Sequence, residues 1–143
     1  MTQRIDDGHS TRLAFAADST VKFYEKTVTP PGIDAGGAID TTTMHNTTYR
    51  TKSPKALLDI SDAALTVAYD PATYTEILAL AGVNTLITVT FPDGDTLAFY
   101  GWLDKFTPGE LVEGEQGTAD IEIIASNVND SGVETAPVYT AAA

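Results

Sequence analysis

The sequence contains no cysteine and only two histidines among 143 residues. Without cysteine there are no disulfides and no thiolate metal ligands, which favours a cytosolic over a secreted origin. Neither His9 nor His45 stands in a motif with a serine or a carboxylate that would mark a catalytic site. The acidic DGD at residues 93–95 lacks the further oxygen ligands that a calcium loop places at fixed spacing. We therefore predict that the chain is not an enzyme and holds neither a metal nor a cofactor.

Positive charge is also scarce, with eight lysines and arginines against 20 aspartates and glutamates and a formal net charge of −12. Such an acidic chain would repel the phosphates of nucleic acid, which argues against a protein that wraps DNA or RNA. No run of about 20 apolar residues is present, so no membrane insertion is predicted. The start, MTQRIDDGHST, has no apolar core of the kind that a signal peptide needs. The length suits one domain that buries roughly 70% of its unfolded surface.

Alternation of apolar and polar residues predicts several β-strands. Residues 64–69 (ALTVAY) and 118–125 (TADIEIIA) alternate most clearly. The strongest hairpin signal is residues 85–103, because Pro92-Asp93-Gly94 suits a type I turn closed by a left-handed glycine. Residues 12–16 and 20–28, on either side of an Asp18-Ser19 turn signal, predict another hairpin. We expect a mainly β fold, a β-sandwich or partial barrel of about six to seven strands.

One helix is predicted over residues 70–81, lying on the sheet. Asp70 suits the N-cap, Pro71 suits the first helical position and Gly82 suits the C-terminal cap. The apolar residues between these caps fall at i, i+3, i+4 and i+7, which predicts one apolar stripe. The residues of this stripe are Tyr74, Ile77, Leu78 and Ala81.

A stretch of about 27 residues, Thr29 to Lys55, is rich in proline, glycine and threonine, and a loop that long is unusual unless it is functional or disordered. Its second half, HNTTYRTKSPK (45–55), contains three basic residues, and no acidic residue occurs from Thr41 to Leu58. We predict a long inter-strand loop over residues 32–55. Its marked members are Gly32, Asp34, Gly36, Gly37, Asp40 and Tyr49.

A second segment, DKFTPGELVEGEQGTADIE (104–122), is strongly acidic. Glycines punctuate the run, which is typical of a surface loop, and nothing beside it indicates a hydrolytic carboxylate pair. Complementary patches at different places on one surface make a heterologous contact, which closes into rings or continues as a filament. We predict contacts between copies in which the bases of the long loop meet these acids. The residues concerned are Arg50, Lys52, Lys55, Glu110, Glu113, Glu115 and Asp120.

Three segments resemble the major tail tube proteins of long, non-contractile bacteriophage tails. They are TPPGIDAGGAIDTTT, LTVAYDPATYTEILAL and ITVTFPDGDTLAFYGWLDKFTPGELVEGEQGTADIEI, and the resemblance runs in order from about Thr29 to Ile124. It implies a β-sandwich flanked by a helix, with six copies closing into a ring around one continuous inner barrel. In that family the rings stack and a long loop reaches the adjacent ring. By resemblance, residues 32–55 correspond to that loop.

The resemblance also implies a function and partners. The chain would be a structural virion protein that self-assembles into the tail tube through which the genome passes at ejection. Its partners would be further copies of itself, a tape measure protein, and tail-tip and tail-terminator proteins. DNA would pass without specific binding through an acidic lumen that repels it. The protein would be located in the tail of the virion, and in the host cytoplasm during assembly.

The domain limits that we expect are an N-terminal arm over residues 1–11, a tail-tube domain over 12–126 and a C-terminal arm over 127–143. Two alternatives remain open. The chain could be a monomeric acidic β-sandwich that binds a carbohydrate or protein ligand. It could also form the inner tube of a contractile tail or of a secretion machine.

Overall fold

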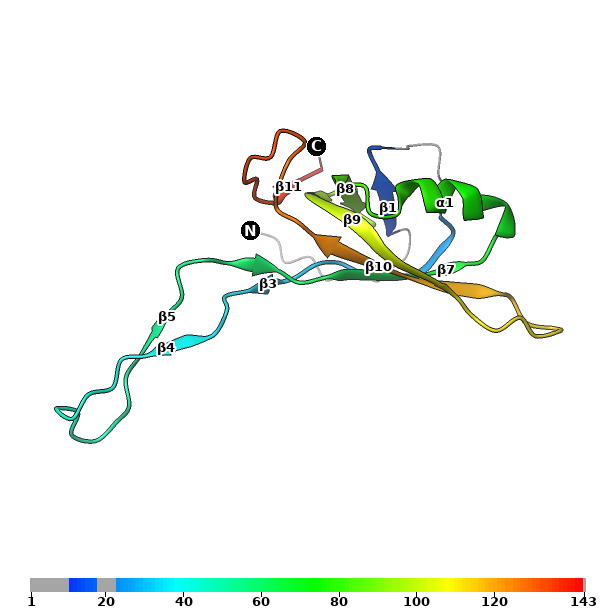
Figure 1. The fold of residues 1–143 in the computed structure, drawn as a ribbon. Coiled ribbons are helices and arrows are strands. Elements are labelled where there is room, and N and C mark those ends of the chain that lie inside the picture. Colours follow the sequence, from blue (N-terminus) through cyan, green and yellow to red (C-terminus); the bar gives the residue numbers. More distant parts are fainter. Residues whose placement is uncertain (1–10, 18–22, 143) are drawn as a thin grey trace.

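The computed structural model of the chain describes residues 11–17 and 23–142 and has a mainly β fold (Figure 1). The main sheet has seven strands in the order β1-β8-β9-β10-β7-β2, with β11 pairing along β9. These strands are β1 (Arg12–Phe15), β2 (Glu25–Thr29), β7 (Ala63–Ala68), β8 (Thr85–Thr90), β9 (Thr96–Pro108), β10 (Thr118–Ala125) and β11 (Val138–Thr140). All the pairings are antiparallel. The prediction of a mainly β fold is confirmed.

The main sheet curls into a half-barrel, and its edge strands β1 and β2 approach each other. The backbone N–H of Leu13 in β1 donates a hydrogen bond to Glu25 Oε1 in β2 at 3.2 Å. Alternate residues of the strands are buried, so the larger apolar side chains fill one side of the curled sheet. This core comprises Leu13, Phe15, Ala63, Leu65, Val67, Ile77, Leu80, Ile87, Val89, Phe99, Leu103, Ala119, Ile121 and Ile123. Of the two expected arrangements, the partial barrel is the one observed.

The helix predicted over 70–81 is present as a 3-10 turn, η1 (Pro71–Thr73), followed by α1 (Tyr74–Leu80). Asp70 caps its start, because the carboxylate accepts a hydrogen bond from the Ala72 N–H at 3.0 Å. Gly82 follows its end with a φ of +74°, a conformation that glycine adopts without strain. The caps that the sequence indicated therefore set both ends of the helix.

The predicted apolar stripe of this helix is wrong in its position. Ile77 and Leu80 are the buried residues, whereas Tyr74, Leu78 and Ala81 are exposed. At 3.6 residues per turn, positions i and i+3 lie on one narrow face, which is all that so short a helix presents to the sheet. The helix is thus rolled so that Leu80 packs in place of Leu78, which stays 63% exposed.

The hairpin predicted for residues 12–28 is also wrong. β1 pairs with β8 and β2 pairs with β7, so these two strands are opposite edges of the sheet. The turn signal at Asp18-Ser19 lies outside the described residues. A turn signal predicts a reversal of the chain, but pairing depends on which partner buries Leu13 and Phe15. The hairpin of residues 85–103 is confirmed, with β8 paired to β9 and a φ of +94° at Gly94.

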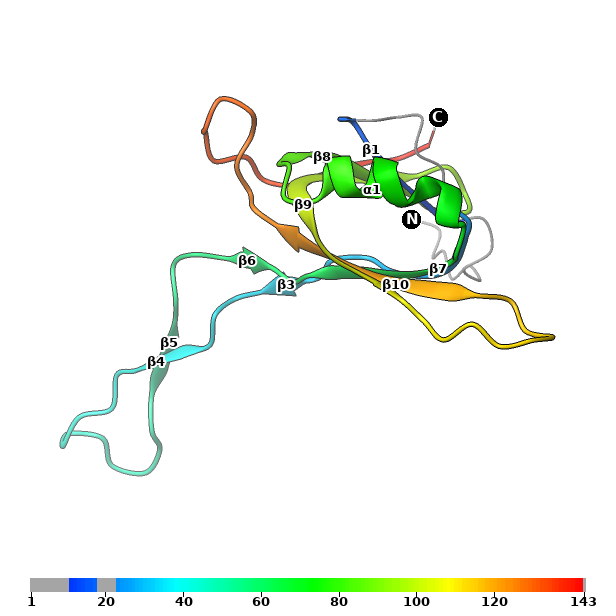
Figure 2. The same ribbon diagram turned by 45° about the vertical axis from the view of Figure 1, so that its right-hand side comes forward.

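The chain between β2 and β7, residues 30–62, forms a long two-stranded structure that projects from the sheet, and we call it the ribbon (Figures 1 and 2). β3 (Ile33–Asp34) pairs with β6 (Asp59–Ile60), and β4 (Ala38–Asp40) pairs with β5 (Lys52–Pro54). Sequence analysis predicted an irregular loop here. Nearly all of the ribbon's side chains are exposed, so neither face selects apolar residues and no periodicity is left to read.

The ribbon bends between its two pairs of short strands (Figure 2). The outgoing arm takes four steps from Asp34 to Ala38, whereas the return arm takes five from Pro54 to Asp59. Gly36 and Gly37, in the shorter arm, have φ values of +81° and +87°, which strain any residue with a Cβ. An unequal number of residues in two paired arms bends them, as a β-bulge does. The outer half of the ribbon therefore points in a fixed direction away from the sheet.

The C-terminal segment is docked on the main sheet. One side of β9 is shared, because β10 pairs along residues 101–108 and β11 pairs along residues 96–98. The Tyr139 hydroxyl and the Ala142 N–H both donate hydrogen bonds to the Asp95 carboxylate. The arm expected over 127–143 thus has a strand of its own. The arm expected over residues 1–11 lies outside the described residues, except for Thr11.

Candidate assembly interface

The tip of the ribbon, residues 41–51, is held by hydrogen bonds among its own residues. The Thr41 N–H donates to the Thr51 carbonyl at 3.0 Å, which closes the tip at its base. Asn46 Oδ1 accepts from the Thr43 N–H at 2.9 Å, and Asn46 Nδ2 donates to the Tyr49 carbonyl at 2.9 Å. Short polar side chains that bond to nearby backbone groups stiffen turns. The tip therefore has a defined shape although most of it is exposed.

The predicted basic residues lie together on the return side of the ribbon. Arg50 pairs within the ribbon, since its Nη1 lies 3.1 Å from Asp40 Oδ2. Bonds from the Thr42 hydroxyl and N–H, and to a smaller extent from Arg50, hold the pKa of the Asp40 carboxyl below its ordinary value. Lys52 and Lys55 make no ion pair within the described part of the chain. Three bases against Asp40 leave two positive charges in excess over residues 38–55.

The predicted long-loop residues shape the ribbon rather than bind anything within the chain. Gly32 is tied to the return arm, because its N–H donates to Ser61 Oγ at 2.7 Å. Asp34 Oδ1 accepts from the Gly36 N–H at 2.7 Å, which stabilises the bend. Tyr49, by contrast, is 82% exposed at the tip. A large aromatic side chain held so far into solvent is a candidate contact residue.

Three of the predicted acids lie on the loop between β9 and β10, residues 109–117, which we call the acidic loop. Its base is closed by a 2.8 Å hydrogen bond from the Gly109 N–H to the Thr118 carbonyl. A turn with a φ of +84° at Gly114 forms its tip. The acids on it, all exposed, are Glu110, Glu113 and Glu115. The loop contains no basic residue, so it carries three uncompensated negative charges.

Asp120 is separate from the acidic loop. It lies on the outer face of β10, where its Oδ1 accepts a 2.9 Å hydrogen bond from the Thr66 hydroxyl of β7. Two residues on, Glu122 lies 3.6 Å from Lys105 Nζ of β9 on the same face. The structure thus brings three of the four predicted acids together and places Asp120 on the sheet. The outer face of β7 and β10 is consequently a surface of hydroxyls, small residues and carboxylates.

The outer half of the ribbon, residues 38–55 with their two excess positive charges, and the acidic loop lie at opposite ends of the molecule (Figures 1 and 2). The ribbon leaves the sheet where β7 begins, at Ala63, and the acidic loop leaves it where β9 ends, at Pro108. Within the described residues no ion pair joins the two. Because the two segments lie at opposite ends of one chain, they can meet only between different copies of the chain, and their opposite charges favour that contact.

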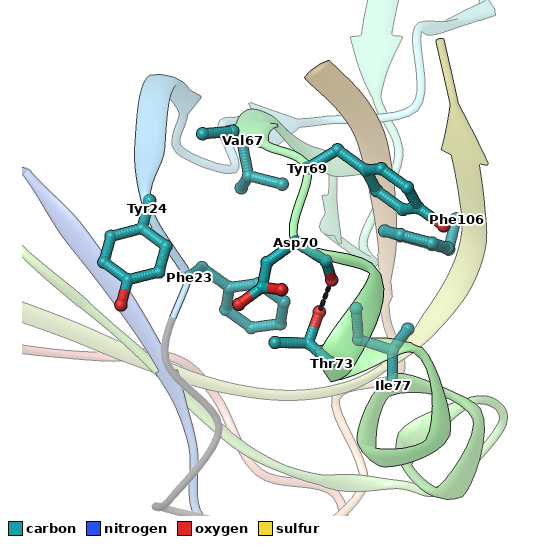
Figure 3. A pocket seen from close by; sticks show the side chains of 9 residues that line it. Phe23, Tyr24, Val67, Tyr69, Asp70, Thr73, Ile77 and Phe106 are labelled. Carbon is teal, nitrogen blue, oxygen red and sulfur yellow. Dashed lines mark hydrogen bonds between the residues drawn. The ribbon is translucent and has the colours of Figure 1, made fainter. Parts of the chain in front are cut away.

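An aromatic cluster lies beside the acidic loop, beneath the start of the helix (Figure 3). The rings of Tyr69 and Phe106 have centroids 5.9 Å apart, and the rings of Tyr74 and Phe106 have centroids 6.4 Å apart. The Tyr69 N–H donates to the Gly117 carbonyl at 2.9 Å, which ties the cluster to the acidic loop. A cavity of about 10 Å³ borders it, lined in part by Phe23 and Tyr24, and holds one water at most. Sequence analysis missed this cluster, although two tyrosines flanking a helix cap were a visible signal.

Among the described residues, no three histidine, aspartate or glutamate side chains lie close enough together to hold a metal ion. None of the helices described has the length and apolarity to cross a membrane. His45 is exposed at the ribbon tip, and His9 lies outside the described residues.

Comparison with known proteins finds similarity at the level of structure. No protein-family model matches the sequence, and no sequence of a curated protein matches it. A chain from the tail of an empty gene transfer agent particle, refined helically with C6 symmetry, superposes with a TM-score of 0.67. A chain from the virion of the native gene transfer agent particle superposes with a TM-score of 0.66. Both are 10% identical in sequence and are covered over 100% of their length by 96% of this chain.

Two further structures are similar at lower TM-scores. A chain of the 6-fold symmetrised anti-feeding prophage baseplate has a TM-score of 0.57 at 8% identity, over 81% of this chain and 87% of that one. The SPP1 Dit protein, described as a paradigm of the hub adsorption apparatus in phages of Gram-positive hosts, has a TM-score of 0.50 at 14% identity. There the match covers 82% of this chain and 50% of Dit. The curled sheet with its flanking helix is therefore a fold that also occurs in chains of these tail and baseplate assemblies.

Proposed function

We propose that the chain is the structural subunit of a phage-type tail tube, built from stacked six-membered rings in the manner of the tail tube family. The observation that carries this proposal is the placement of the outer half of the ribbon (residues 38–55), which has an excess of positive charge, and of the acidic loop at opposite ends of one molecule. A contact between unlike ends repeats from copy to copy, so it produces a ring or a continuous stack rather than a closed dimer. The gene transfer agent tail, refined with C6 symmetry, is a precedent for this fold in such an assembly.

The sheet supplies a second reason for assembly into rings. Its edge strands β1 and β2 each have one side that no strand of the described residues pairs with. Edges of this kind invite pairing with another strand. If each half-barrel joins its neighbours side by side, the edges are covered and the separate sheets become one inner barrel. In the resulting tube, the outer face of β7 and β10 would line the lumen and form its inner wall.

That wall would suit passage of DNA without binding. Thr66, Asp120 and Glu122 lie on this face, and Lys105 beside them is paired with Glu122. A surface of hydroxyls and carboxylates repels the phosphate backbone and offers no unpaired cation for it to hold. In this proposal the partners are further copies of the chain, a tape measure protein during assembly, and tail-tip and tail-terminator proteins at the two ends. The site of action is the tail of the virion.

The proposal is tested by negative-stain electron microscopy of the purified protein at rising concentration, with and without a tail-tip seed. Hollow tubes with regular axial striations are expected. Reversal of Arg50, Lys52 and Lys55 to glutamate should leave a folded monomer, because all three side chains are exposed, and should stop tube growth. The matched control exchanges the same three residues for the other base, Arg50→Lys, Lys52→Arg and Lys55→Arg, which keeps every charge and should leave tubes intact. Normal tubes from the triple variant would overturn the electrostatic contact.

A second candidate is a single ring of a baseplate. The similarity to the anti-feeding prophage baseplate and to Dit favours this candidate. The same micrographs separate the two, because a baseplate ring would stay a single ring at every concentration whereas a tube subunit stacks. A protein that stays monomeric even with a seed would instead support the alternative of a monomeric domain that binds a carbohydrate or protein ligand.

A further inference from the structure

The tip of the ribbon presents two apolar side chains to solvent. Met44 is fully exposed and Tyr49 is 82% exposed. Both belong to the turn that Thr43 and Asn46 hold in shape by hydrogen bonds. Apolar groups presented on a stiff turn lose little conformational freedom when they bind, so they serve as anchors. The tip is therefore an apolar centre with Arg50 and Lys52 beside it in the chain.

The opposite end of the molecule has the matching arrangement. Tyr69, Tyr74 and Phe106 form an apolar centre there, and Tyr74 is 52% exposed. Leu111 of the acidic loop, 69% exposed, lies near this cluster through its approach to Gly117. Five acids of the described residues belong to the same end of the chain, Asp70 and Glu76 of the helical segment and Glu110, Glu113 and Glu115 of the acidic loop. An apolar centre within a charged rim is the usual anatomy of a protein interface.

We propose that Met44 and Tyr49 of one copy dock on the Tyr69, Tyr74 and Phe106 cluster of a second copy. This inference rests on the proposed function and names the contact that would join successive rings. The second copy is chosen as the occupant because the rims are opposite in sign, basic around the tip and acidic around the cluster. The charges orient the two ends, while burial of the apolar centres supplies most of the affinity.

The side chain of Met44 suits this receptor. The cavity beside the cluster has room for one water at most, so an incoming side chain lies across the aromatic rings rather than deep between them. An unbranched thioether adapts to a shallow, uneven surface and makes favourable contacts with aromatic rings. Figure 3 shows the ring of Tyr69 beside Phe106 at this surface. Met44 is also the only methionine apart from Met1, so its replacement removes the one internal thioether.

The absence of cysteine makes the contact open to direct crosslinking. His45→Cys beside the anchor and Thr75→Cys beside Tyr74 place single thiols next to the two surfaces while leaving the contact residues intact. A short thiol-to-thiol crosslinker applied under assembly conditions should give a ladder of multiples of 15.1 kDa. The matched control pairs His45→Cys with Ser131→Cys, an exposed position away from the cluster, and should give no such ladder. We call the chain with His45→Cys and Thr75→Cys the 45/75 variant. If it forms tubes but no crosslinks, the docking site is overturned and the proposed function stands.

A second measurement tests the energetic role of the anchor. Met44→Asp should slow tube growth by about tenfold or more, because a charge at the centre of an interface must be desolvated. Met44→Leu, which keeps size and apolarity, should grow tubes at close to the parent rate. Both variants should unfold like the parent, since Met44 is fully exposed. Parent-like growth of Met44→Asp would overturn the anchor. Crosslinks of the 45/75 variant in the absence of tubes would retain the docking site and reject the tube, and absence of both would reject both.

Discussion

The Tyr139 hydroxyl on β11 donates a hydrogen bond to Asp95, a residue 44 positions earlier in the chain. Asp95 lies between β8 and β9 and is only 5% exposed. Its other carboxylate oxygen accepts from the Ala142 N–H at 2.6 Å. A buried carboxylate needs such donors, because an ionised group left without them is very costly. One acidic side chain therefore adds two hydrogen bonds to the strand pairing that docks the C-terminal segment on β9.

Asp95→Asn should release this segment. The two donors bond to different oxygens of the carboxylate, and the amide NH2 that replaces one of these oxygens cannot accept, so we expect a loss of about 1–3 kcal/mol in the free energy of unfolding. Urea denaturation measures the loss, and hydrogen exchange at the Tyr139 and Ala142 amides reports the release. Tyr139→Phe removes one donor only and should cost less. Unchanged exchange at these amides in Asp95→Asn would show that the three residues of β11 hold the segment without help.

Charge exchange between the two ends should restore assembly. Reversal of Glu110, Glu113 and Glu115 to lysine should block tube growth, as reversal of the three ribbon bases does, because like charges then face each other. In a mixture of the two variants, unlike charges face each other only where the two variants alternate. The six changes are therefore combined in one chain, in which every such contact joins unlike charges. Tube growth of that combined variant, followed by light scattering, should recover. Failure to recover would mean that the two loops do not meet.

Gly101→Ala should destabilise the fold severely. A Cβ at this position would lie 2.3 Å from the Ile124 carbonyl oxygen of the neighbouring strand, and a backbone atom cannot move aside cheaply. We expect a loss of about 3 kcal/mol or more. Gly132→Ala is the control, since that site has open space and only a φ of +78° to strain it, which costs about 1–2 kcal/mol. Thermal unfolding of the two variants measures both losses of stability. Equal losses in Gly101→Ala and Gly132→Ala would contradict the steric explanation.

Acid should loosen the ribbon tip only well below neutral pH. The pKa of Asp40 is lowered from its ordinary value of 3.8. The hydrogen bonds from the Thr42 hydroxyl and N–H contribute most to this lowering, and the bond from Arg50 contributes least. Because the pKa is lowered in the folded chain, the contribution of the Asp40 carboxylate to stability is present above the unfolded pKa. This contribution is lost as the pH falls through the folded pKa. NMR titration of the Asp40 carboxyl should therefore give a midpoint below 3.8. Thr42→Val should raise that midpoint more than Arg50→Gln does, and the reverse order would contradict the assignment.

The parts of the fold that bury one face could be read from the sequence. Val67, Ile87 and Ile121 alternate with polar neighbours because one side of each strand faces the core, and Asp70 and Gly82 act locally at the helix ends. Such signals depend only on residues near in sequence, so they survive without knowledge of the fold.

The remainder depends on partners distant in sequence or on surfaces without a core. The pairing of β1 with β8 joins residues more than 70 positions apart, and no local pattern specifies it. The ribbon gives no periodic signal, since both of its faces are exposed. For the candidate interface, the charges of Lys52 and Glu113 were legible as composition. Their separation to opposite ends, and the cluster around Phe106, required the three-dimensional arrangement.

The unequal arms of the ribbon also constrain how this protein can change over generations. Insertions that add the same even number of residues to both arms would extend the ribbon and keep every side chain on its present face. A single insertion in one arm would turn the side chains beyond it to the opposite face, because strand residues alternate. Arg50 and Lys55 would then point away from any neighbour they now serve. Relatives of this chain are therefore expected to vary the ribbon freely in composition but in length only by matched pairs.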